Sequence, residues 1–353
     1  MRRDLVDVES MTAMKDLMGS LGSPNMDCRT DGGVFNTDSR GSYLFNSGIA
    51  GIDDADAILL IGVNPRYEAT LVNARIRKNW LEKRIPIALI GEQVDLTYPY
   101  ERPMIIVGSG VFRRDDSLAI HALLHKAAED LGAIKKDWNG FNVLHNAASR
   151  VGGLDIGFLP QKDGKGFADI MAGTKDGSIK AVFLLGADEF NARVNIGWQT
   201  FVVYQGHHGD HGAERADVIL PSAAYTEKDG IYVNTEGRPQ MAKRAVTPPG
   251  DAKEDWAILR ALSEHICAAP LPYNSASELR TRIQKEWAIF KSMDQITPAK
   301  WTKFTHKGKV LKDNFTSSNK NYYFNNAICR ASQTMQECVD AFSDVQEFRE
   351  AAE

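Results

Sequence analysis

The sequence has few cysteines and no cysteine cluster. Its four cysteines, Cys28, Cys267, Cys329 and Cys338, are far apart, and none belongs to a CxxC pair. Iron–sulfur clusters are held mainly by sets of cysteine thiolates, so we expect no cluster in this chain. Cys329 and Cys338 are the nearest pair, and in a helix the steps of about 100° per residue would place them on opposite faces. We interpret all four as separate thiols in a reducing compartment.

An excess of positive charge and long apolar runs are also missing. The 42 lysine and arginine residues are outnumbered by 46 aspartate and glutamate residues, which gives a net charge of −4. Such a chain offers no broad electropositive surface to nucleic acid or anionic lipid. Its longest apolar runs, 57–63 and 181–185, are far shorter than the roughly 20 residues that span a bilayer. The start, MRRDLVDVES, lacks the apolar core of a secretory signal and does not resemble a transit peptide. We expect no nucleic-acid partner, no direct membrane span, and a protein that is soluble or peripheral to a membrane complex.

A phosphate-binding fingerprint and a catalytic constellation are absent as well. Residues 62–65, Gly-Val-Asn-Pro, predict a tight turn after a strand, but they lack the GxGxxG spacing of a dinucleotide site. Residues 205–211 contain three histidines and an aspartate, a composition that suggests metal binding. The interspersed glycines leave no rigid helix to hold His207 and His211 one turn apart, so we expect no metal there.

What the sequence does contain is a repeated alternation of apolar strands and amphipathic helices. Short apolar runs that end at glycine or proline predict strands at 57–62, 85–90, 104–107, 181–185, 201–204 and 216–220. Helical periodicity follows, as in the segment with Val72, Ile76 and Trp80 at steps of four. This alternation indicates an α/β fold with mostly parallel sheets. Residues 141–151 are also predicted to be helical, and 152–177 to form a surface loop.

The length of 353 residues suits two α/β domains and an extension. A proline-rich stretch at 97–103 marks a boundary, so we predict a first lobe at 1–100, a second at 101–270, and C-terminal helices with an extended tail at 271–353. The helix predicted at 8–18 has no strand before it, so we expect the chain to be the second half of a larger fold. The polar segment from 293 to 326 is expected to fold onto a surface because of its aromatic residues, which are Trp301, Phe304, Phe315, Tyr322, Tyr323 and Phe324.

The stretch from 216 to 240, ADVILPSAAYTEKDGIYVNTEGRPQ, carries the most specific signal. With the preceding YQGHHGD it resembles the ADVxLP and EKxGTxxNxEGRxQ pattern of the molybdopterin oxidoreductase superfamily. Further phrases, among them NPRYEATLVNARIRKNWL, VFLLGAD and ICRASQTM, resemble the C-terminal region of the large iron–sulfur subunit family of mitochondrial respiratory complex I. These phrases are spread along the sequence, and the resemblance covers about four fifths of the chain.

The resemblance implies two Rossmann-like lobes with mostly parallel sheets, plus a C-terminal extension. In pterin enzymes the segment matching Arg40-Gly41-Ser42 presents the metal-ligating side chain, and serine can serve as that ligand. The resemblance to the complex I subunit implies instead that this region has no catalytic residues and no cofactor. The residues of a vestigial pterin cleft would then be Ser42, Gly62, Asn64, Pro65, Gly186, Asp188, Gln205 and Asn234.

Among the function classes, a non-catalytic scaffold agrees best with these observations. A free nucleotide-binding enzyme would need a phosphate loop and catalytic groups that the sequence does not show. The resemblance implies a subunit of the peripheral, matrix-facing arm of mitochondrial complex I, which supports electron transfer from NADH to ubiquinone. The expected partners are the cysteine-rich half of the same subunit, which would carry the iron–sulfur clusters as a separate polypeptide, and other peripheral-arm subunits. The alternative is a fragment of a molybdopterin-dependent oxidoreductase with metal bound near Ser42.

Overall fold

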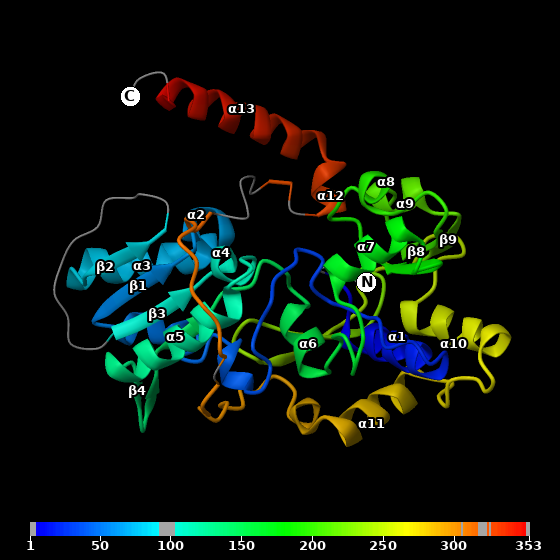
Figure 1. Ribbon diagram of the computed structural model, residues 1–353, viewed down its shortest axis with the longest axis horizontal. Coiled ribbons are helices and arrows are strands. Elements are labelled where there is room, and N and C mark those ends of the chain that lie inside the picture. Colours follow the sequence, from blue (N-terminus) through cyan, green and yellow to red (C-terminus); the bar gives the residue numbers. More distant parts are fainter. Residues whose placement is uncertain (1–4, 92–102, 305, 317–322, 325, 351–353) are drawn as a thin grey trace.

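The computed structural model describes residues 5–91, 103–304, 306–316, 323–324 and 326–350. Two parallel sheets lie at opposite ends of the long axis and define two lobes (Figure 1). Helices α1 (Val8–Ser20), α6 (Arg150–Asp155) and α11 (Ala276–Glu286) lie between and below them. The α/β class and the mostly parallel sheets predicted from the sequence are confirmed.

The first sheet has the strand order β2-β1-β3-β6, with all neighbours parallel. Its strands are β1 (Ala57–Ile61), β2 (Ile87–Ile90), β3 (Pro103–Val107) and β6 (Phe141–Val143). Met104 through Val107 are fully buried, as expected for an inner strand of a parallel sheet that is covered on both faces. Helices α3 (Thr70–Lys83) and α5 (Ser117–Asp130) belong to this lobe.

Three local predictions for this part of the chain are wrong. Strand β3, expected to open the second lobe, pairs with β1, so the first sheet continues across residue 100. The predicted helix at 141–151 begins as β6, because Phe141, Asn142 and Val143 are fully buried against β3. The predicted loop at 152–177 contains α7 (Phe167–Asp176) and most of α6. Pairing with distant strands overrides local propensity in the first two cases.

The second sheet has the order β7-β8-β9, again parallel. Its strands are β7 (Ala181–Leu185), β8 (Phe201–Gly206) and β9 (Val218–Pro221). Helix α7, with α8 (Ala192–Asn195) and α9 (His211–Arg215), covers one face through a cluster that includes Ile170, Leu184 and Tyr204.

Helix α1 belongs with the second lobe, although residues 1–100 were predicted to form the first. It packs against α10 (Asp255–Ile266), α11 and the hairpin strand β10 (Gly230–Val233). Met11, Met14 and Leu17, which follow one helical face, are almost completely buried there.

A single apolar core joins the two lobes. It includes Val107 and Phe141 from the first sheet and Leu185, Ile231 and Leu259 from the second lobe. The hairpin of β10 and β11 (Pro239–Ala242) also contacts the first part of the chain. The Phe45 N–H donates to the Thr235 carbonyl in the turn of this hairpin at 2.8 Å. The remaining elements are α2 (Pro65–Glu68), α4 (Ser109–Phe112), β4 (Ile134–Lys135), β5 (Trp138–Asn139), α12 (Ala327–Arg330), α13 (Gln333–Glu350), and short 3-10 turns at Arg40–Ser42, Ala50–Asp54 and Ala288–Lys291.

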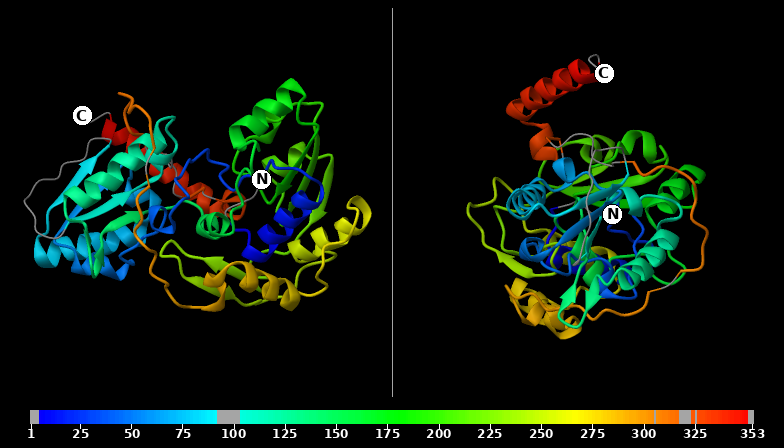
Figure 2. Two further views of the ribbon diagram at one scale, coloured as in Figure 1. Left: turned by 60° about the horizontal axis from the view of Figure 1, so that its bottom comes forward. Right: turned by 90° about the vertical axis from the view of Figure 1, so that its left-hand side faces the viewer.

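The aromatic tail folds onto the body, as its composition predicted. Trp301 and Phe315 pack against the shared core, and Phe304 is part of it. Tyr322 lies outside the described residues. Beyond α12, helix α13 stands apart from both lobes and runs toward the side of the first (Figures 1 and 2).

Candidate functional site

The turn after β1 forms one wall of a cavity of about 720 Å³ at the carboxyl end of the first sheet. Gly62 has φ +56°, and a Cβ there would lie 2.9 Å from the Val111 side chain, so glycine is required. Asn64 caps α2 by accepting the Arg66 N–H at 3.1 Å, and Pro65 stands in the first turn of that helix. The structure thus brings the three predicted residues Gly62, Asn64 and Pro65 together beside an open space.

The corresponding edge of the second sheet is occupied by the C-terminal segment. Gly186, at φ +57°, directly follows β7, and the fully buried Asp188 comes two residues later. The Asp188 carboxylate accepts a hydrogen bond from the Arg330 guanidinium at 3.3 Å and lies 3.4 Å from the Tyr204 hydroxyl, which donates to the His208 carbonyl at 2.8 Å. Asp188 therefore has protein partners where an open α/β sheet would present groups to a ligand.

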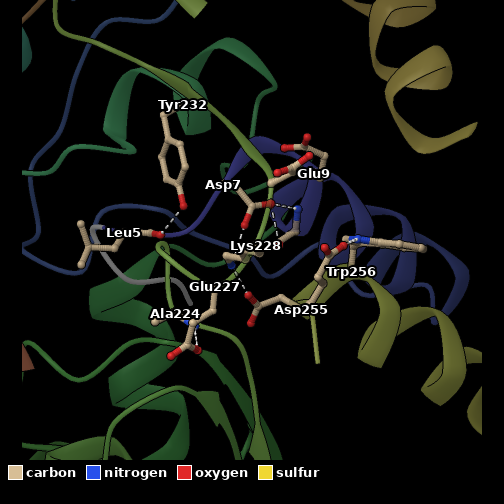
Figure 3. Close-up of polar contacts among 12 residues, drawn as sticks. Leu5, Asp7, Glu9, Ala224, Glu227, Lys228, Tyr232, Asp255 and Trp256 are labelled. Atoms are coloured by element: carbon tan, nitrogen blue, oxygen red, sulfur yellow. Dashed lines mark hydrogen bonds and ion pairs between the residues drawn. The ribbon is translucent and has the colours of Figure 1, made fainter. Parts of the chain in front are cut away.

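Gln205, the next predicted residue, belongs to a buried charged cluster. Its amide donates to the Asp255 carboxylate at 2.9 Å. Asp255 also pairs with Lys228, and Lys228 contacts Asp7 as well, at 2.6 Å (Figure 3). All four side chains are almost inaccessible to solvent. We call Asp7, Lys228 and Asp255 the buried triad.

The triad is held together by charge. Burial opposes the charge on Lys228, but the Asp255 and Asp7 carboxylates outweigh it and raise the pKa of the ammonium well above its ordinary value. Burial likewise opposes the charge on Asp7, and Lys228 with the N-cap bonds from Ser10 keeps the pKa of that carboxyl below its ordinary value. The triad therefore links the start of α1, the start of α10 and the segment before β10.

Glu9 lies beside the triad and differs from it. Its carboxylate accepts the Ile231 N–H at 2.8 Å and the Arg280 guanidinium at 2.7 Å. Burial and the nearby charge of Asp7 nevertheless raise the pKa of Glu9 to about 7. The sequence offered little signal for this arrangement, because Asp7, Lys228 and Asp255 are far apart in the chain.

The remaining predicted polar residue, Asn234, builds the β10–β11 turn. Its side-chain oxygen accepts the N–H groups of Glu236 at 3.1 Å and Arg238 at 2.9 Å, and its amide donates to the Glu236 carboxylate at 3.0 Å. Such bonds to the following backbone are typical of asparagine in turns.

Ser42 does not fit the role of a metal ligand. Its hydroxyl is fully buried and lies 2.5 Å from the carbonyl oxygen of Asn36 and 2.7 Å from that of Ser39. A metal-bound serine would have to lose its proton, and the resulting anion would be repelled by both oxygens. Within the described part of the chain, no three or more His, Cys, Asp or Glu side chains are grouped as a metal site. The Nδ1 atoms of His207 and His208 lie 2.6 Å apart, and these two histidines do not form such a group with His211 either.

Comparison with known proteins identifies the family to which the chain is similar. The family model described as molybdopterin oxidoreductase matches residues 1–102 and 101–265. A second model, which describes the C-terminal region of the G subunit of NADH-ubiquinone oxidoreductase, matches residues 295–338. The resemblance inferred from the sequence phrases is thus confirmed.

Two curated relatives match almost the entire chain. The mitochondrial NADH-ubiquinone oxidoreductase 78 kDa subunit of Neurospora crassa is 41% identical over 96% of this chain and 49% of its own length. The G subunit of the NADH-quinone oxidoreductase of Rickettsia felis is 41% identical over 96% of this chain and 52% of its own length. The chain therefore spans about half the length of the curated relatives it matches.

Among solved structures, the formyltransferase/hydrolase complex of Methylorubrum extorquens aligns over 81% of this chain and 91% of its own, with 11% identity and a TM-score of 0.40. That score is too low for the fold assignment to depend on it. The family model, which covers most of the chain, shows that this chain belongs to the molybdopterin oxidoreductase family.

Proposed function

We propose that this chain is the C-terminal, non-catalytic region of the large iron–sulfur subunit in an NADH:ubiquinone oxidoreductase, respiratory complex I. The observation that carries the proposal is the 41% identity over 96% of the chain to the Neurospora and Rickettsia subunits. The chain would support electron transfer from NADH to ubiquinone as a scaffold of the peripheral arm.

The predicted cleft residues form hydrogen bonds within the fold, and this supports a non-catalytic role. Asp188 is engaged by Arg330, Gln205 by Asp255, and Asn234 by its own turn. Side chains committed to the fold in this way are not available to orient a substrate or a pterin. We also propose that the redox cofactors of the assembly, its iron–sulfur clusters, are held by the cysteine-rich half of the subunit, because the cysteines of this chain are widely spaced.

The partners we propose are that cysteine-rich half and other peripheral-arm subunits. The exposed edge of the second sheet favours contact with another polypeptide. On β9, Val218 and Ile219 are 39% and 54% exposed, and nearby Phe201 is 48% exposed. Apolar edge strands are seldom left open to water.

The location we propose is the matrix side of the mitochondrial inner membrane. The Neurospora relative is a mitochondrial subunit. None of the helices in the described residues is long and apolar enough to cross a bilayer.

A second candidate is a fragment of a pterin-dependent oxidoreductase, which the family model itself favours. The chemistry of such an enzyme depends on a metal held by the pterin and one protein ligand, and Ser42 is the residue that the resemblance places there. The two carbonyl oxygens around its hydroxyl oppose that role.

A native gel separates these candidates. The chain would be epitope-tagged in its own organism, and solubilised membranes would be stained for NADH dehydrogenase activity and probed for both the tag and the cysteine-rich half of the same subunit. We expect all three signals in one high-mass band. A tagged chain that migrates apart from the NADH dehydrogenase activity would refute the assignment.

A further inference from the structure

The C-terminal segment crosses the carboxyl-end edges of both sheets. We define the strap as the described residues 299–304, 306–316 and 326–330. Figures 1 and 2 show it passing α5 toward α2 on the first lobe and resuming as α12 beside α8 and α9 on the second. In open parallel sheets these edges are where ligands bind.

The first anchor of the strap is aromatic. Phe304 is 1% exposed, and its ring centroid lies 4.3 Å from that of His125 and 4.7 Å from that of His121, both on α5. Trp301 stacks on His125 at 4.6 Å, and its indole N–H donates to Glu129 at 3.1 Å. Residues 301–304 are thus held along one helix by packing and a directed hydrogen bond.

The second anchor is the ion pair of Arg114 and Asp116, which is closed by two hydrogen bonds. The Asp116 carboxylate accepts the Leu311 N–H at 2.6 Å. The Arg114 guanidinium donates to the Asp313 carbonyl and lies 5.0 Å from the centroid of the Phe315 ring. One partly buried ion pair therefore fixes the backbone of the strap on both sides of residue 312.

This anchor places the strap at the predicted cleft. Phe315 and Thr316 line the 720 Å³ cavity together with Gly62, Asn64 and Pro65. The Thr316 carbonyl oxygen lies 2.7 Å from where a Cβ of Gly110 would stand, so the backbone of the strap and the lobe are in direct contact.

The third anchor lies on the second lobe. The Arg330 guanidinium donates to Asp210 at 2.6 Å and to the buried Asp188 at 3.3 Å. Asn326 caps α12 by accepting the Cys329 N–H at 3.0 Å, which orients the short helix that carries Arg330. The strap thus supplies the cation that neutralises Asp188 at the end of β7.

We propose that the strap is a built-in lock, whose described parts cover the carboxyl-end edges of the two sheets with the chain's own side chains. Release of either anchored end opens the edge that it covers. The matched regions agree with a separate role for this segment, because the molybdopterin oxidoreductase model ends at residue 265 and the NADH-ubiquinone oxidoreductase C-terminal model begins at 295. The inference stands on contacts within the chain and does not depend on the proposed function.

Hydrogen–deuterium exchange of the full chain tests the lock. In Arg330→Ala we expect exchange at residues 186–190 and 208–212 to rise about tenfold, since two charge-assisted bonds are lost. In Arg114→Ala the rise should appear at 62–68 and 306–316. Arg75→Ala is the matched control, because Arg75 pairs with Asp53 on the first lobe at 2.7 Å away from the strap. Exchange at both edges no faster than in Arg75→Ala would overturn the proposal.

Two further measurements keep the test decisive if a variant is unstable. Exchange within β1 and β8 must stay as slow as in the unmodified chain, which separates a local opening from unfolding. Asp210→Asn weakens only one Arg330 contact and should give a smaller rise at the same residues. If neither Asp210→Asn nor Arg330→Ala changes the exchange rate at the edge of the second sheet, α12 does not lock that sheet.

Discussion

Replacement of Lys228 by methionine should strongly destabilise the chain. The ammonium lies 2.6 Å from Asp7 and also contacts Asp255, and the lysine and aspartate side chains are 4%, 2% and 6% exposed. Methionine keeps the length of the side chain but removes the charge, which leaves two buried carboxylates without a cation. Breaking one buried ion pair typically costs about 3–5 kcal/mol, and this change breaks two. We therefore expect a loss of at least about 4 kcal/mol in the free energy of unfolding at pH 8.

The loss should depend on pH. In the variant, burial without a cation raises the folded-state pKa of Asp7 above its ordinary value of 3.8. A carboxyl whose folded pKa is raised contributes stability below its unfolded pKa and loses it as the pH rises through the folded pKa. The variant should consequently be less impaired at pH 5 than at pH 8. In the unmodified chain the pKa of Asp7 is lowered, so Asp7 itself gives no such recovery in that range, and the effect of the substitution is the difference in unfolding free energy between the two chains at each pH.

Urea unfolding followed by circular dichroism at pH 5 and pH 8 measures both effects. Lys243→Met is the matched control, because Lys243 is 74% exposed and its ion pair with Asp229 spans 3.5 Å. Exposed pairs of this kind contribute about 1 kcal/mol or less. Adding Asp7→Asn to Lys228→Met should restore part of the stability by removing one stranded charge. If Lys228→Met behaves like Lys243→Met, or loses equally at both pH values, the triad is not the electrostatic unit described here.

Three further predictions concern titration, metal and clusters. Because burial raises the pKa of Glu9 from 4.5 to about 7, the stability it contributes is complete below pH 4.5 and is lost as the pH rises through 7. At about 1.4 kcal/mol per pKa unit this amounts to roughly 3 kcal/mol, and Glu9→Gln should flatten the curve of unfolding free energy against pH in that window. Ser42→Ala should lower the free energy of unfolding by about 1 kcal/mol, because a hydrogen bond is lost. It should leave NADH-to-quinone electron transfer of the assembled complex unchanged. Stoichiometric molybdenum or tungsten in an elemental analysis of the complex would contradict the view that Ser42 binds no metal. The purified chain should be colourless, and visible absorption that bleaches with dithionite would refute the absence of a cluster.

Local structure could be predicted where the residues that determine it lie within one short segment of the sequence. The run 57–61 and the run 181–185 are apolar and end at glycines with positive φ, and both form the predicted strands. Ser275 and Glu278 have the spacing of a capping box, and the Glu278 N–H donates to the Ser275 hydroxyl at 3.2 Å. The Glu278 carboxylate reaches back to the N–H of Asn274 at 2.6 Å, one residue before the cap. Such features depend on neighbours in sequence, which are visible in a sequence.

Sheet membership could not be predicted in the same way. Strand β3 follows a proline-rich stretch, so composition alone suggested the start of a new lobe. Its partner β1 lies more than forty residues earlier, with Ile58 opposite Met104 in the register. Parallel strands are always separated by a crossover connection, so their pairing is non-local. Nothing within residues 103–107 identifies the strand with which β3 pairs.

The candidate site shows the same division between position and chemistry. Gly62, Asn64, Gly186 and Asp188 stand at the ends of strands or just beyond them, as the family pattern implies, because backbone topology fixes where those positions fall. Whether a polar group there can serve a ligand depends on side chains from elsewhere. Asp188 is 142 residues from the Arg330 that neutralises it. A motif shared with catalytic relatives therefore predicts where a cleft will be, while the strap decides what remains open in it.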